Sequence, residues 1–167
     1  MKKTIIIAVI ILILISIPIK IMIDEKILKA KFADIRDKYG ASRAADLERL
    51  YRLETAHFKS EQFKNTGSPG MEAHAPKFPY GWTSLLPFWT KYPQHAPVGF
   101  YSVWENPGLQ NANPKQKNFL KFRDFESALL SLNEYAEKYN IERWYSTRPE
   151  DQQKYRAALN QIKVRFT

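Results

Sequence analysis

The sequence has no cysteine among its 167 residues. Disulfide bonds, thiolate metal sites, a cysteine nucleophile and attachment through a lipidated cysteine are therefore excluded. Glycine is also scarce, and neither a glycine-rich phosphate-binding loop nor the Gly-x-Ser-x-Gly elbow of serine hydrolases occurs. The histidines, His57, His74 and His95, are separated by 17 and 21 residues, which matches no compact metal-binding motif. No metal or other cofactor is expected.

Acidic residues are missing from the first 23 positions, which are dominated by isoleucine, leucine and valine. Lys2 and Lys3 precede the apolar run, and Lys20 lies near its end, where a long side chain can reach the interface. About 20 apolar residues suffice to cross a bilayer, and positive charge before the run favours export of the chain after it. We therefore expect residues 1–23 to be a single-pass membrane anchor, with the rest of the chain periplasmic or extracellular. A cleaved signal peptide is the alternative, although no small-x-small cleavage site comes after the run.

The formal net charge is +9, and the three lysines of the anchor segment account for three of these charges. The exported part therefore carries +6, which favours anionic partners. Nucleic acid is the usual partner of so basic a chain. Outside the cytoplasm, however, the available polyanions are lipid headgroups and cell-wall polymers, so no nucleic acid is expected. A positive surface that only keeps the protein soluble explains the charge equally well.

The exported part is long enough for one domain with a hydrophobic core, and its aromatic content is that of a folded protein. Apolar residues recur at intervals of three and four up to Tyr39, and Gly40 is placed to end a helix. We expect residues 24–41 to form a stalk helix and residues 42–167 to form the domain. Ser42 is the expected N-cap of the second helix. Its buried face is expected to contain Leu47, Leu50, Tyr51 and Phe58.

Proline and tryptophan become frequent between residues 65 and 118, which hold eight of the ten prolines and three of the four tryptophans. Because proline cannot donate a backbone hydrogen bond, this segment is predicted to be an ordered lobe of loops and turns, with a hairpin around 99–104. Helical periodicity returns after Asp124, an expected N-cap, and after Pro149, an expected first helical residue. The predicted fold is therefore α+β and mostly helical.

Glu54 is the strongest candidate for a catalytic residue in the sequence. At 100° per residue, Glu54 projects within about 60° of Leu47, Tyr51 and Phe58, so it is predicted to lie on the apolar face of the second helix. Burial disfavours an ionised carboxylate and raises its pKa, which gives an acid able to donate a proton near neutral pH. The general acid of a glycoside hydrolase is held in this state. Alternatively, the side chain turns to solvent or pairs with Arg52, His57 or Lys59.

Residues 52–63, together with 67–71, resemble the end of the catalytic helix in the lysozyme-like glucosaminidases and related peptidoglycan hydrolases. In that family a Glu-Ser-Gly motif ends the helix, a serine comes a few residues later, and a Gly-hydrophobic turn closes the loop. The resemblance places Glu54 as the catalytic acid, Ser60 as the later serine and Met71 in the turn.

Two later stretches extend the resemblance over residues 45–166 in order. Residues 119–139 look like the family's later helix, entered through an aromatic residue and an acidic cap, and residues 144–162 are similar to its final helix. This chain departs from the pattern by Thr55-Ala56 in place of Ser-Gly, and by Thr-Gly-Ser-Pro-Gly in place of the Asn-Leu-Phe-Gly turn. The missing asparagine leaves open a non-catalytic wall-binding or assembly protein on the same fold.

The resemblance implies a lysozyme-like domain that cleaves the glycan strand of peptidoglycan after N-acetylglucosamine, although muramidases and lytic transglycosylases use the same glutamate. Glycoside hydrolysis needs a second group unless the substrate's N-acetyl group assists. Glu105, beside a tryptophan and an Asn-Pro-Gly turn, is the first candidate, ahead of Glu72 and Glu61.

Aromatic side chains can stack on sugar faces, although core packing is the commoner fate of each ring. The residues expected to contact the glycan, including the two placed by the family resemblance, are Ser60, Met71, Trp82, Tyr101, Trp104 and Tyr145.

Overall fold

The computed structural model describes residues 23–74, 77–104 and 116–167. Over these ranges the α-helices are α2 (Glu25–Tyr39), α3 (Ala41–Glu54), α4 (Glu61–Thr66), α5 (Leu86–Lys91), α6 (Phe125–Lys138) and α7 (Pro149–Gln161). Three short 3-10 helices are η1 (Thr83–Leu85), η2 (Pro93–His95) and η3 (Ile141–Trp144), and the strands are β1 (Gly99–Trp104) and β2 (Gln116–Lys121). The described chain is thus mostly helical α+β, which confirms the predicted class.

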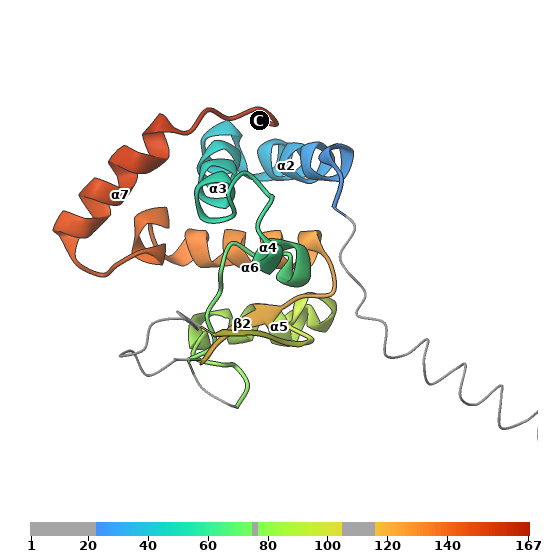
Figure 1. Ribbon diagram of the computed structural model, residues 1–167. Coiled ribbons are helices and arrows are strands. Elements are labelled where there is room, and N and C mark those ends of the chain that lie inside the picture. Colours follow the sequence, from blue (N-terminus) through green and yellow to red (C-terminus); the bar gives the residue numbers. More distant parts are fainter. Residues whose placement is uncertain (1–22, 75–76, 105–115) are drawn as a thin grey trace, which may run out of the picture.

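The helix α6 runs through the middle of the molecule. Helices α2, α3 and α7 lie on one side of it, and the β1–β2 hairpin with α5 lies on the other (Figure 1). Asp124 caps α6 as predicted, because its Oδ1 accepts a hydrogen bond from the Ser127 amide at 2.8 Å. Pro149 likewise begins α7 as predicted.

The junction between α2 and α3 is a single residue, Gly40. Its φ of +93° is readily adopted only by glycine, and it serves both as the C-cap of α2 and as the N-cap of α3. The expected cap at Ser42 is therefore wrong, because the turn is so tight that Ser42 already lies within the helix. The three apolar residues of α2 that are buried, Leu28, Phe32 and Ile35, belong to the main core. The segment expected to be a stalk thus packs as part of the domain.

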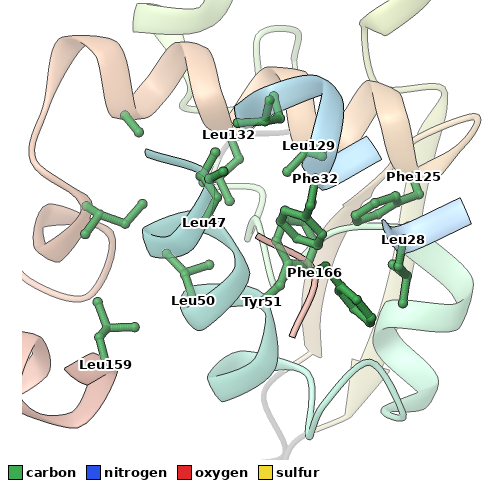
Figure 2. Close-up of a cluster of buried hydrophobic side chains, with 14 of the residues drawn as sticks. Leu28, Phe32, Leu47, Leu50, Tyr51, Phe125, Leu129, Leu132, Leu159 and Phe166 are labelled. Carbon is green, nitrogen blue, oxygen red and sulfur yellow. The ribbon is translucent and has the colours of Figure 1, made fainter. Parts of the chain in front are cut away.

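Two hydrophobic clusters make up the core, and α6 contributes to both. Phe125, Leu129 and Leu132 face the first cluster, between α2, α3 and α7 (Figure 2). Ala128 and Tyr135 face the second cluster, under the hairpin and α5. Because α6 has apolar partners on both sides, it is buried almost all around.

The first cluster is closed by the C-terminal tail. Phe166 packs on Phe32 with ring centroids 6.1 Å apart. Both oxygens of the buried Glu48 carboxylate hold this tail, since they accept the backbone amides of Arg165 at 2.7 Å and Phe166 at 3.0 Å. The same carboxylate accepts Arg52 Nε at 2.6 Å, an ion pair within α3.

The lobe predicted between residues 65 and 118 contains the expected hairpin. The strands β1 and β2 pair antiparallel, from Gly99 opposite Lys121 to Trp104 opposite Gln116. Residues 119–121, the start of the stretch compared with the family's later helix, lie in β2. Trp89 of this lobe is buried against α6, where its indole nitrogen donates to Ser131 Oγ at 2.9 Å.

In the part of the chain that the structure describes, no helix is both long and apolar enough to cross a bilayer. The anchor predicted for residues 1–23 lies outside that part, except for Ile23.

Candidate functional site

Glu54 is the last residue of α3, and its side chain is partly buried. Its Oε1 accepts a hydrogen bond of 2.5 Å from the hydroxyl of Tyr155, which α7 brings from 101 residues further along the chain. Removal from water raises the pKa of the Glu54 carboxyl above its ordinary value, the direction expected from the sequence. The Tyr155 hydrogen bond opposes this effect in part, because it stabilises the ionised form. The result is an acid that holds its proton to higher pH than an exposed glutamate does.

Tyr155 is a fixed donor to this acid. Burial, together with the neighbouring Glu54 carboxylate, raises the pKa of Tyr155 far above its ordinary range, so the hydroxyl keeps its proton. Its ring stacks on Tyr145 with centroids 5.0 Å apart and planes 3° from parallel. Tyr145 itself is 63% exposed. Tyr155 binds Oε1 of Glu54, and no described residue forms a hydrogen bond with Oε2, which is therefore the oxygen left to carry a transferable proton.

The backbone after Glu54 is fixed by an unusual turn. Ala56, His57 and Phe58 all have positive φ, at 49°, 57° and 68°, in the left-handed region that side chains disfavour. The Thr55 hydroxyl holds the turn, since it donates to the Tyr51 carbonyl and accepts the Phe58 amide at 2.8 Å. The turn stops α3 at Glu54 and returns Phe58 to the first cluster.

A cleft of about 290 Å³ lies in the part of the molecule that includes η1 and η3, and Glu54 is not among its lining residues. Its lining residues are mostly aromatic and are His74, Gly81, Trp82, Thr83, Ser84, Tyr135, Tyr139, Arg143 and Trp144. Trp82 and Trp144 face each other with ring centroids 5.7 Å apart. Trp144 directly precedes Tyr145, whose ring covers Tyr155. Neighbouring residues at the end of η3 therefore link the aromatic cleft to the Glu54–Tyr155 pair.

Of the candidates for a second carboxylate, Glu72 lies next to this cleft. Its backbone carbonyl accepts the Trp82 indole N–H at 2.8 Å, and the residue forms an isolated β-bridge with Phe119. The carboxylate is partly exposed, with Lys117 Nζ 3.7 Å from Oε2. Glu105 lies outside the described residues. Glu61 is exposed at the start of α4, where it pairs with Lys64 at 2.7 Å.

The residues expected to contact a glycan are distributed unevenly. Trp82 lines the cleft, and Tyr145 stacks over Tyr155. Ser60 instead caps α4, where its Oγ accepts the Phe63 amide at 3.2 Å, and Met71 is fully buried. These two side chains therefore hold the loop between α3 and the hairpin.

Tyr101 and Trp104 lie three residues apart on β1, which places them on opposite faces of the hairpin. Tyr101 is half-buried, whereas Trp104 is 57% exposed. Because the two rings lie on opposite faces of the hairpin, they cannot both stack on the same sugar ring.

Tyr155 is the residue that the sequence pattern missed as part of the site, because it fits the apolar face of α7. The one available signal was general: a buried tyrosine hydroxyl needs a hydrogen-bond partner. Nothing in the local pattern identifies Glu54 as that partner. Comparisons of the chain with protein-family models, with curated proteins and with solved structures give no match.

Proposed function

We propose that this domain is a peptidoglycan hydrolase that cleaves the glycan strand with Glu54 as general acid. The observation that carries the proposal is the carboxyl of Glu54, whose pKa is raised by burial and which the Tyr155 hydroxyl orients through a 2.5 Å hydrogen bond. The resemblance of residues 45–166 to lysozyme-like glucosaminidases supports N-acetylglucosaminidase specificity. A membrane anchor at residues 1–23 would place the domain beside its substrate.

In the proposed reaction, Oε2 of protonated Glu54 donates its proton to the glycosidic oxygen. The C–O bond breaks, its electron pair stays with the departing sugar oxygen, and positive charge develops on the remaining sugar ring. The Tyr155 hydroxyl already points at Oε1, so it stabilises the carboxylate at the moment the proton leaves. This hydrogen bond strengthens as charge develops, which is the condition for a catalytic contribution.

The developing cation requires a second group, which stabilises the charge or activates the water whose oxygen forms the new bond to the sugar carbon. The proton released by that water goes to this group or back to Glu54. Glu72 is the described candidate, because Trp82 fixes its backbone beside the aromatic cleft. Glu105 and the N-acetyl group of the substrate are the alternatives. Trp82 and Trp144 supply flat apolar faces of the kind that stack on the CH-rich side of a pyranose.

A peptidoglycan gel tests the mechanism. We expect the full chain to clear the gel. Glu54→Gln should reduce the rate of clearing roughly 10²–10⁴-fold, because general acid catalysis contributes about that factor. Glu137→Gln is the matched control, since it removes an exposed carboxylate of α6 that pairs with Arg43 of α3 at 3.1 Å, away from Glu54 in sequence and in contacts. Equal clearing by the wild type and Glu54→Gln would rule out the proposed acid.

Mass spectrometry of the digest identifies the bond that is cleaved. A new N-acetylglucosamine reducing end supports a glucosaminidase, an N-acetylmuramic acid end indicates a muramidase, and an anhydro end indicates a lytic transglycosylase. The second and third products would keep the Glu54 mechanism but overturn the specificity.

A non-catalytic wall-binding protein is the second candidate, and the turn at residues 66–70 favours it. This turn replaces the family's asparagine, and its polar groups are used internally: the Ser68 amide donates to Thr66 Oγ1 at 3.1 Å. Both side chains are fully buried. Sedimentation with insoluble peptidoglycan separates the two functions, because a wild-type protein that binds without clearing supports this second candidate.

A further inference from the structure

A larger cleft, of about 680 Å³, shares no lining residue with the aromatic one and is formed by three parts of the chain that are distant in sequence. These are the start of α2 at residues 23–28, the end of α3 with its left-handed turn at 52–59, and the C-terminal tail at 161–166. The Glu48 hydrogen bonds to the tail fix this arrangement. The cleft is therefore part of the folded core structure.

Positive charge dominates this cleft. Four permanent cations line it, Arg52, Lys59, Lys163 and Arg165, together with His57. The acids nearby are Glu25 on the rim and Glu48 behind Arg52. Over the described residues, the side chains of Lys59, Lys163 and Arg165 form no ion pair with either acid or with any other. Within that part of the chain, three cations therefore face the cleft without a carboxylate partner.

The interior of the cleft is apolar. Leu28, Phe58 and Phe166 line it, and the guanidinium of Arg52 lies over the last two rings, with Cζ 5.2 Å and 4.6 Å from their centroids. Arg52 Nη2 is buried and has no hydrogen-bond partner within the described part of the chain. A basic rim around an apolar interior matches a molecule with an anionic head and a hydrocarbon body.

Ile23 contributes to the wall of the same cleft. It is the residue that joins the domain to residues 1–22, with their long apolar run. Adjacent Cα atoms are about 3.8 Å apart, so an anchor ending at Ile23 brings the cleft to the bilayer surface, where lipid phosphates lie. Charge, apolar interior and position thus point to the same ligand.

We propose that this cleft binds the phosphate group of an anionic membrane lipid. Lys59, Lys163 and Arg165 contact the phosphate, while the glycerol and first acyl carbons lie against the apolar interior. Lipid binding at this place holds the domain in one orientation on the membrane, and so fixes the height of the aromatic cleft above the bilayer. The inference rests on the proposed anchoring through residues 1–23, and does not depend on hydrolysis.

The test uses the full chain in detergent micelles, titrated with phosphatidylglycerol, phosphatidylcholine or inorganic phosphate. Thermal unfolding and native mass spectrometry report the stabilisation and the number of bound lipids. Lys163→Gln with Arg165→Gln removes two rim charges, and both side chains are exposed, so the fold is retained. Lys26→Gln with Lys29→Gln is the matched control, because it removes two exposed charges of α2 that follow the anchor closely in sequence but do not line the cleft.

We expect saturating phosphatidylglycerol to raise the Tm of the wild type and of the control by roughly 5 °C. The cleft variant should bind this lipid roughly tenfold or more weakly, as expected for two lost phosphate contacts. Equal losses in both variants would overturn the site in favour of general surface charge. Equal stabilisation by phosphatidylcholine would overturn the headgroup selectivity, and equal stabilisation by inorganic phosphate would overturn the lipid as the ligand.

Membrane fractionation of cells that express the full chain assesses the anchor separately. A chain recovered in the soluble fraction overturns the anchor and, with it, the lipid assignment. A membrane-bound chain that lacks selective phosphatidylglycerol binding overturns the lipid site alone.

Discussion

The Glu54 carboxyl is subject to two opposing influences, burial and the Tyr155 hydrogen bond. Burial raises its pKa, and the hydroxyl lowers it. As a proton donor, the carboxyl is active only while protonated, so the proposed activity falls as pH rises through this pKa. Tyr155→Phe removes the hydrogen bond, and Glu54→Gln removes the titrating carboxyl itself. The first should change the pH dependence of the activity, and the second should change the pH dependence of the stability.

Tyr155→Phe removes the hydroxyl and leaves burial unopposed. The pKa of Glu54 should then rise further, which moves the alkaline limb of the pH–rate profile to higher pH, while the maximal rate falls because the carboxyl loses its orienting donor. The measurement is peptidoglycan release as a function of pH. Tyr145→Phe is the control, since it keeps the stacked ring and should leave the alkaline limb in place. An unmoved or acid-shifted limb in Tyr155→Phe would contradict this role.

Glu54→Gln should make the stability of the folded protein less dependent on pH. The raised pKa means that the folded state binds this proton more tightly than the unfolded chain does, whose carboxyl titrates near the ordinary value of 4.5. The resulting stability is fully present below pH 4.5 and is lost as pH rises through the raised pKa. Glutamine is neutral at every pH in this range. The free energy of unfolding of the variant should therefore increase relative to that of the wild type between about pH 3.5 and about pH 7. Urea unfolding at the two values measures this gain, and a difference independent of pH would argue against burial as the cause.

At the scale of elements, helix boundaries set by one local residue were predictable. Asp124 and Pro149 act through contacts within one turn, so the sequence reveals them. The start of α3 was not predictable, because the chain reverses at Gly40 alone. Glu48 was missed for another reason: on a helix it fits a solvated position, and only the distant tail supplies the backbone amides that make its burial favourable.

The turn after α3 also bears on one departure from the family pattern. Ala56 occupies a left-handed position, and the compared family has glycine there. A left-handed conformation costs a residue with a Cβ about 1–2 kcal/mol, whereas glycine loses about 0.5–1 kcal/mol more backbone entropy on folding. We therefore expect Ala56→Gly to stabilise the fold by roughly 0.5–1 kcal/mol in urea unfolding. Ala45→Gly, inside α3, should destabilise it by about 1 kcal/mol. Destabilisation by both substitutions would show that the turn is not strained at Ala56.

At the scale of the molecule, the general plan was predictable and the site was not. Composition and periodicity predict an α+β chain with a hairpin inside a proline-rich lobe. The pairing of Glu54 with Tyr155 spans 101 residues and depends on how α7 packs against α3. The same holds for the basic cleft, since residues 52–59 and 161–166 become neighbours only in the folded chain.

The position of α6 between the two clusters has a consequence for unfolding. The helix α6 supplies buried residues to both clusters, so its detachment from one cluster would also expose the apolar residues of the other. We therefore expect the domain to unfold in one cooperative transition. Leu132→Ala, in the first cluster, should destabilise the whole domain by about 2–5 kcal/mol. Far-UV circular dichroism follows the helices, whereas tryptophan fluorescence is weighted toward the second cluster, where Trp89 is buried and Trp82 packs, with Trp144 packing against both clusters. The two signals should shift together in the variant, because a cavity made beside one face of α6 weakens the support of the other. If fluorescence kept its wild-type midpoint while the helical signal moved, the two clusters would be separate folding units.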